Sequence, residues 1–220
     1  MNRFSKISAF SLFFASLLAN ISLAADLTPQ QDRELALYLA VSGGWNHLNS
    51  ASISVPILGT VGEIFFDDGW TGSVAVGAHL TNHVRAELEL AAHRNGLNHE
   101  DFVGVGRIDL GGGVQVYDSL VKIAYDFGDG PLRPFVGAGV GVANFGINLE
   151  SPATGSDNAW ALAGALEAGL NYSISPHAEL FATGQLLMLG DVHIDPTSSG
   201  GGTLSHPTLI STSVGVRWNF

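Results

Sequence analysis

A regular alternation of apolar residues with small or polar residues is the feature that most constrains the fold of this chain. In residues 209–220 (LISTSVGVRWNF), one face is mostly apolar and ends in Trp218 and Phe220, while the other is small, polar and carries Arg217. Residues 84–93 (VRAELELAAH) alternate in the same way. A period of two places alternate side chains on opposite faces of a β-strand. We therefore predict strands whose two faces meet different surroundings.

The composition excludes several other classes of protein. Hydrophobic residues make up 46% of the chain and charged residues only 13%, and there are 28 glycines. This balance disfavours a helical bundle and suits many strands joined by turns. The net charge of −11 argues against a nucleic-acid partner. The lack of cysteine excludes disulfides and thiolate chemistry.

The first 25 residues are predicted to be a cleaved signal peptide. Arg3 and Lys6 precede an apolar segment at 9–19, and small residues follow at Ser22 and Ala24. A membrane anchor is the alternative, but the apolar run is shorter than the ~20 residues that a spanning helix needs. Residues 26–220 are then a single exported domain.

Eight strands are predicted in that domain, at 37–46, 69–80, 84–93, 114–127, 134–145, 160–172, 179–188 and 209–220. Long connections at 47–68, 94–113, 146–157 and 190–207 alternate with short turns. A strand tilted at about 45° crosses a membrane in about 9–11 residues. Short turns on one side and long loops on the other are typical of outer-membrane barrels. The predicted fold is all-β: an eight-stranded antiparallel transmembrane β-barrel, an up-and-down meander with short periplasmic turns and long extracellular loops.

The aromatic residues agree with a barrel that has two interfacial girdles. On the predicted strands, Trp45, Trp70 and Trp160 fall near the outer interface, and Tyr125, Tyr172, Trp218 and Phe220 near the periplasmic one. Phe135 is an exception, because its parity points inward. The glycines at 137, 139 and 141 recur at every second residue, which does not match a nucleotide-binding loop. Small residues on a crowded inner face explain them better.

Three stretches resemble a known family: FDDGWTGSVAVGAHLTNHVRAELELAAHR at 66–94, SLVKIAYDFGDGPLRPFVGAGVGVANFG at 119–146, and the closing VGVRWNF. They look like the small eight-stranded outer-membrane barrels of the opacity-protein, surface-antigen and OmpA-like group. The resemblance implies the outer membrane of a Gram-negative-type cell, and outer-membrane lipid and lipopolysaccharide as neighbours. It also implies that barrel-assembly machinery recognises the terminal Phe220.

A buried network of charges is predicted inside the barrel, made of Arg85, Glu87, Glu89, Lys122, Asp126, Glu167, Glu179 and Arg217. It forms either an ion path or gate, or a plug of mutually paired charges. The plug is favoured, because an eight-stranded interior is just wide enough for side chains and buried charges need partners. Arg217 is expected to pair with at least one of the four glutamates.

Metal and catalytic sites are not predicted. His93, His99, Glu100 and Asp101 gather near the second loop, and His193 and His206 in the fourth, but their spacing matches no tight ligand motif. Ser198, Ser199, Ser205 and His206 are the candidates for catalysis. They show no constellation of nucleophile, base and orienting group. No enzyme activity and no cofactor are expected.

The function expected from these observations is that of a surface-exposed structural barrel, of adhesin or surface-antigen type. Its four long loops are rich in Gly, Ser, Asp and Asn, which suits mobile recognition surfaces for a host or environmental ligand. The first alternative is a narrow channel for ions or small solutes. A more remote alternative is an enzyme that modifies outer-leaflet lipids.

Overall fold

The computed structural model describes residues 36–55, 59–102, 106–151, 154–194 and 202–220. The predicted signal peptide, Ser198 and Ser199 lie outside the described residues. All regular structure in the described part of the chain is β-strand. Within it, no helix is long and apolar enough to cross a membrane.

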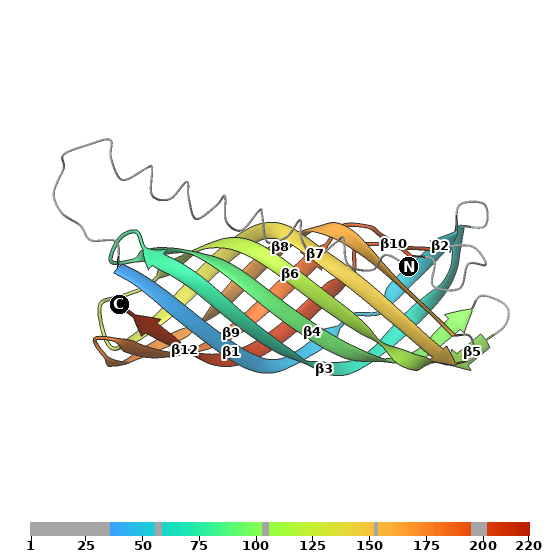
Figure 1. The fold of residues 1–220 in the computed structure, drawn as a ribbon, viewed down its shortest axis with the longest axis horizontal. Helices are drawn as coiled ribbons and strands as arrows, with labels where there is room; N and C mark the ends of the chain where they lie inside the picture. The colour runs from blue at the N-terminus through green and yellow to red at the C-terminus, as the bar shows by residue number, and fades with distance from the viewer. Residues whose placement is uncertain (1–35, 56–58, 103–105, 152–153, 195–201) are drawn as a thin grey trace, which may run out of the picture. The chain divides into compact units, whose positions relative to one another are not determined.

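Eight long antiparallel strands close into a ring (Figure 1). Each pairs with the next in the order β1, β3, β4, β6, β7, β8, β9 and β12, and β12 returns to pair with β1. Their bounds are β1 Ala36–Leu48, β3 Gly59–His79, β4 Val84–Phe102, β6 Gly111–Asp126, β7 Leu132–Ser151, β8 Gly155–Ser175, β9 Ala178–Leu189 and β12 Thr208–Asn219. The predicted eight-stranded up-and-down barrel is confirmed.

The two ends of the barrel differ, as predicted. At one end, short turns join the strands. In the first turn, the Leu80 amide donates a hydrogen bond to the Val84 carbonyl at 2.8 Å. We call this the turn end. There the Phe220 amide donates to the Leu37 carbonyl at 2.9 Å, which extends the pairing that closes the ring. At the opposite, extended end lie four short strands: β2 Ala51–Val55, β5 Gly106–Asp109, β10 Val192–Ile194 and β11 Gly202–Leu204.

The long connections are largely β-structure rather than irregular loops, which corrects the predicted strand bounds. β3 and β8 each have 21 residues and β7 has 20. Because about 9–11 residues suffice to cross a membrane, roughly half of each strand lies beyond it. The small strands β10, β11 and β2 continue the sheet from β3, and β5 pairs with β4. The described parts of the segments between the membrane strands therefore form a β-extension of the barrel.

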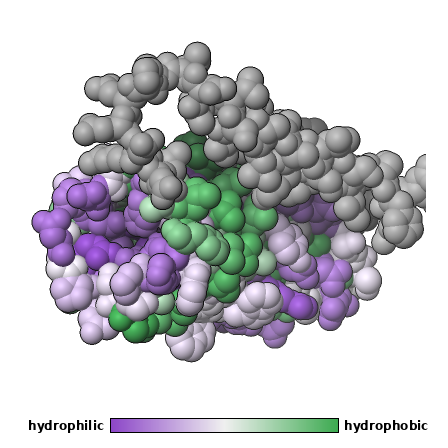
Figure 2. All heavy atoms as spheres, turned by 60° about the vertical axis from the view of Figure 1, so that its left-hand side comes forward, coloured by the Kyte–Doolittle hydropathy of each residue, from purple (hydrophilic) through white to green (hydrophobic). Residues whose placement is uncertain are grey.

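The two halves of the barrel have opposite hydropathy, and β6 shows both. Near the turn end, Ile123 and Tyr125 are exposed outward, while Lys122 and Asp126 are buried inward. Near the extended end, Val114 and Val116 are buried inward, and the outward positions are polar or aromatic. Figure 2 shows the result on one face: a hydrophobic band with hydrophilic surface on either side. A wall that faces lipid must be apolar outside, whereas a wall that faces water is stable with its apolar side chains inside.

One apolar core fills the extended half. Its buried members include Leu48, Phe66, Leu97, Val114, Val116, Leu120, Phe145, Ile147, Leu187, Leu189, Val192, Ile194, Leu204 and Leu209. They come from the ring strands and also from β10 and β11. We call this cluster the apolar plug. Residues 192–194 form a strand here because both inward side chains, Val192 and Ile194, enter this core.

Candidate functional site

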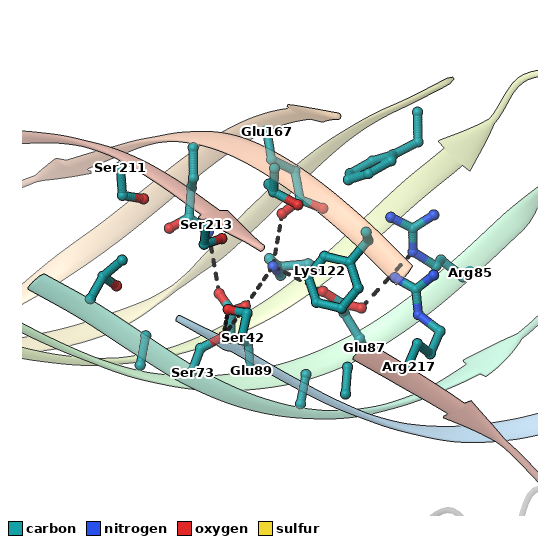
Figure 3. A pocket seen from close by; sticks show the side chains of 18 of the residues that line it. Ser42, Ser73, Arg85, Glu87, Glu89, Lys122, Glu167, Ser211, Ser213 and Arg217 are labelled. Atoms are coloured by element: carbon teal, nitrogen blue, oxygen red, sulfur yellow. Dashed lines mark hydrogen bonds and ion pairs between the residues drawn. The ribbon is translucent and has the colours of Figure 1, made fainter. Parts of the chain in front are cut away.

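Lys122 is the centre of a charge cluster in the half of the barrel near the turn end (Figure 3). Its Nζ atom lies 2.9 Å from Glu87, 3.0 Å from Glu89 and 2.8 Å from Glu167. Lys122 comes from β6, the first two glutamates from β4, and Glu167 from β8. All four side chains are buried. A single ammonium ion thus holds three carboxylates together across the lumen.

The glutamates differ in how many other partners they have. Tyr38 donates its hydroxyl to Glu87 at 2.7 Å. Glu89 accepts from Ser73 and from Gln185, each at 3.2 Å. Glu167 is paired only with Lys122 among the described residues. Glu167 therefore depends most strongly on the lysine.

A second cluster lies between Lys122 and the turn end. Arg85 pairs with Asp126, which also accepts a hydrogen bond from Asn171 at 2.7 Å. Arg217 donates to Asn171 at 3.2 Å and to Glu179 at 2.9 Å.

Aromatic rings complete this cluster. The Arg85 guanidinium lies 4.3 Å from the ring centroid of Phe135 and that of Arg217 lies 4.9 Å from Tyr38. Such cation–π contacts are worth about 0.5–2 kcal/mol each and occupy the faces of the guanidinium groups. Phe135 points inward, as its parity predicts, and serves as one of these platforms.

All eight residues of the predicted interior network lie inside the barrel, and each belongs to an ion pair: Arg85, Glu87, Glu89, Lys122, Asp126, Glu167, Glu179 and Arg217. Sequence reasoning missed Arg133, which also pairs with Glu179. Arg133 lies between two prolines at 131 and 134, just before the predicted strand 134–145. β7 begins at Leu132, so Arg133 has the inward parity of Phe135.

Two glycines of β7 make room for the network. A Cβ atom at Gly137 would lie 2.7 Å from an oxygen of Glu167, and one at Gly139 would lie 2.5 Å from Cγ of Lys122. Both distances are too short for real side chains. The alternating glycines thus leave space for the long charged side chains of neighbouring strands.

A further buried pair lies on the side of Lys122 that faces the extended end. His93 Nε2 is 2.9 Å from Asp118, and both side chains are almost fully buried. Nδ1 of His93 and the other oxygen of Asp118 have no hydrogen-bond partner. Toward the extended end, the next inward residue on β6 is Val116 of the apolar plug, and on β4 it is the buried Asn95. His93 and Asp118 therefore mark the boundary between the polar and the apolar interior.

The interior leaves little empty space. The cavity among the polar residues has a volume of about 30 Å³ and is bordered by Lys122, Glu89, Thr71 and Ser211. Above this cavity, the apolar plug closes the lumen with fully buried side chains such as Leu120 and Leu187.

The aromatic residues assigned to girdles all lie on the outer surface: Trp45, Trp70, Trp160, Tyr125, Tyr172, Trp218 and Phe220. Trp45 and Trp70 face each other on β1 and β3. Tyr125 packs edge-on against Phe127, with 5.0 Å between centroids. Tyr117 is another exposed ring that the sequence analysis did not assign.

The histidines and serines near the loops are dispersed. His93 is inside the barrel, whereas His99 stacks on Phe65 with 4.5 Å between the ring centroids. His193 contacts Thr203, and His206 lies 3.2 Å from Asp191 at the surface. No group of three or more potential metal ligands occurs within the described ranges. In the same ranges, no hydrogen bond joins Ser205 to His206.

Glu100 and Asp101 lie on the β-extension, outside the membrane half. Asp101 is 3.4 Å from Arg107. Glu100 is buried opposite Ile64 of β3 and Ile108 of β5. Burial beside these apolar residues raises the pKa of the Glu100 carboxyl to about 7.

Comparison with known proteins agrees with this architecture. The model of the outer membrane protein beta-barrel domain matches residues 13–220. The chain belongs to this family. Membership implies that the chain lies in the outer membrane. In barrels of this kind the short turns are periplasmic and the longer loops extracellular. No curated protein sequence matches it.

Solved structures show the same fold. Neisserial surface protein A is 18% identical with a TM-score of 0.58, covering 85% of this chain and 100% of the other. OprG from Pseudomonas aeruginosa is 16% identical with a TM-score of 0.60, covering 85% and 97%. The outer membrane protease OmpT from Escherichia coli is 8% identical with a TM-score of 0.55, covering 88% and 99%. At these identities the likeness concerns the fold alone.

Proposed function

We propose that this barrel is a closed outer-membrane anchor that presents its β-extension to the surroundings, as an adhesin or surface antigen does. The observation that carries the proposal is the double closure of the lumen. A layer of paired charges around Lys122 is followed, toward the outside, by the apolar plug. A barrel closed in this way can serve the cell surface only through its outer wall and its extracellular end.

The dimensions of the interior support closure over conduction. An ion in transit must keep or replace its hydration shell, and the cavity among the paired charges is small, about 30 Å³. The apolar plug is built from aliphatic and aromatic side chains, with only the buried amides of Asn46 and Asn95 beside it among the described residues, and burying an uncompensated charge is expensive. The alternative of a narrow channel therefore requires both layers to move.

The β-extension supports a role in surface contacts. β3, β7 and β8 continue well past the membrane as paired strands, so the extracellular part is held in shape by a ladder of backbone hydrogen bonds. A rigid surface loses little conformational entropy when a partner binds. The proposal thus differs from the sequence-based expectation of mobile loops, and rests instead on a preformed surface.

Planar-bilayer recording tests the closed lumen. The purified barrel is expected to give no steady single-channel steps. Steps that disappear in Arg85→Gln or Lys122→Met variants would overturn the proposal and establish the narrow channel. Deacylation of purified lipopolysaccharide by the wild type, lost in His206→Ala, would instead establish the enzymatic alternative.

Adhesion of barrel-expressing cells to a cultured epithelial layer tests the extracellular surface. Ile194 of β10 is the register partner of Gly202 of β11, so residues 195–201 can be replaced by a short turn that keeps the buried Val192, Ile194 and Leu204. The shortened barrel is expected to fold, as shown by its altered gel mobility before boiling, and to lose adhesion. Equal adhesion by the shortened barrel and by cells without any barrel would contradict the proposal.

A further inference from the structure

A hollow on the outer wall of the barrel lies apart from the lumen. Its volume is about 480 Å³, which is within the range of small-molecule sites. We call it the rim groove and define it by Trp45, Trp70, Arg94, Gly113, Gln115 and Asn148. The groove does not depend on the proposed surface function.

Strand register creates this groove. Trp45, Trp70, Arg94 and Gln115 lie directly opposite one another on β1, β3, β4 and β6. The residues next to them in sequence, such as Asn46, Thr71 and Asn95, are buried inward, so this row points outward. It forms one continuous band of two indole rings, a guanidinium and an amide.

Glycines leave space beside this band. In the next outward row, Gly96 lies opposite Gly113, and Gly113 lies opposite Asn148. Two neighbouring positions thus have no side chain. The groove is hollow because Arg94 and Gln115 have these glycines, rather than larger residues, on their extracellular side.

The groove offers one cation that the protein does not use. Arg94 is exposed and has no hydrogen-bond or ion-pair partner in the described part of the chain. Three carboxylates near its margins are engaged: Asp68 is 2.7 Å from His47, Glu150 accepts from Asn148 at 3.3 Å, and Asp67, beside Gly96, accepts from Asn98 at 2.6 Å. A guanidinium suits a phosphate or carboxylate, because it can donate two parallel hydrogen bonds.

The depth of the groove indicates its occupant. Trp45 and Trp70 belong to the outer aromatic girdle, where indole rings lie at the level of lipid headgroups. On β4, the outward residues Leu88, Leu90 and Ala92 lead directly to Arg94. A molecule in the groove therefore has its apolar part against the membrane band and its polar part beside Arg94.

We propose that the rim groove binds the phosphorylated sugar headgroup of an outer-leaflet glycolipid. The Arg94 guanidinium takes the phosphate, and the amides of Gln115 and Asn148 are placed for sugar hydroxyls. The indoles of Trp45 and Trp70 pack against the sugar ring and the first carbons of the acyl chains.

Binding of lipid A to the full-length barrel in maltoside micelles tests this proposal, with tryptophan fluorescence or native mass spectrometry as readout. Arg94→Gln is expected to weaken binding of bis-phosphorylated lipid A about tenfold or more. Dephosphorylated lipid A should bind the wild type as weakly as bis-phosphorylated lipid A binds the Arg94→Gln variant.

Arg107→Gln is the matched control, because Arg107 is an exposed cation of the extracellular end outside the groove. It should bind within about twofold of the wild type, since an exposed cation far from the ligand contributes little. All variants are first shown to fold by gel mobility. Unchanged binding by Arg94→Gln, or an equal loss in Arg107→Gln, would overturn the proposal. Displacement of lipid A by millimolar inorganic phosphate would also overturn it, because it would reveal a general anion site.

Discussion

Replacing Lys122 with methionine tests the physical basis of the closed lumen. Methionine keeps the length of the side chain but removes the ammonium ion, which lies 2.8–3.0 Å from three buried carboxylates. Removing one partner of a buried ion pair costs about 3–5 kcal/mol, because it leaves an uncompensated charge. Three carboxylates lose their counterion here. We therefore expect the free energy of unfolding to fall by at least that amount at pH 7.

The partners of each glutamate predict which second change restores stability. Glu87 keeps its hydrogen bond from Tyr38, and Glu89 keeps those from Ser73 and Gln185. Glu167 keeps none in the described structure. Glu167→Gln should therefore restore more of the stability of Lys122→Met than Glu89→Gln does.

Urea unfolding in bilayers, followed by gel mobility and tryptophan fluorescence, measures these differences. Arg107→Gln serves as a control, because an exposed ion pair is worth about 0–1 kcal/mol. The reasoning is refuted if Lys122→Met unfolds within about 1 kcal/mol of the wild type. Equal restoration by Glu89→Gln and Glu167→Gln would refute the assignment of Glu167 as the most dependent partner.

Two further predictions concern the extracellular half. Phe145→Ala should lower the free energy of unfolding by about 3–5 kcal/mol, since Phe145 is fully buried in the apolar plug, and the lipid-facing Val140→Ala is the control. The Glu100 carboxyl has its pKa raised from 4.5 to about 7, so the folded state binds more protons than the unfolded state between these values. Stability of the β-extension should then fall as pH rises from 5 to 8, by at most about 3 kcal/mol. Glu100→Gln should remove this dependence in hydrogen exchange of β4; a slope unchanged by the substitution would contradict it.

The membrane half could be predicted from sequence because its alternation is constant: the outward residues are apolar, and the inward residues are small or polar. On the predicted strands, parity alone places Arg85, Lys122 and Arg217 inside and the girdle residues outside. Parity does not give the pairing. Arg217 had four candidate glutamates, and the structure joins it to Glu179 because these residues are register partners on β12 and β9. Such choices depend on inter-strand register, which a single sequence does not contain.

The extracellular half was not predicted because its alternation is reversed: apolar residues point inward there, and polar residues point outward. In segment 192–194, for example, Val192 and Ile194 are apolar and inward while His193 is outward. A search for apolar outward faces therefore assigns such segments to loops. His93 has a different explanation: it ends the predicted strand 84–93, yet it was also grouped with His99 near the second loop. His93 follows the inward parity of Glu87 and Glu89 on β4 and is buried with Asp118.

Different forces hold the two halves of the barrel together, and the hydropathy inversion follows from this difference. In the membrane, apolar side chains gain little by leaving lipid for a protein interior, since lipid tails are as apolar as leucine. The inward face there is free to be polar, provided that its charges are paired. Beyond the membrane, water surrounds the wall, and the hydrophobic effect again favours an apolar interior. The lumen is thus closed twice by independent means: by ion pairs in the membrane half, and by apolar packing in the extended half. Loss of Lys122 leaves the apolar plug in place, and loss of Phe145 leaves the charge network in place, so neither change alone should open a path for ions.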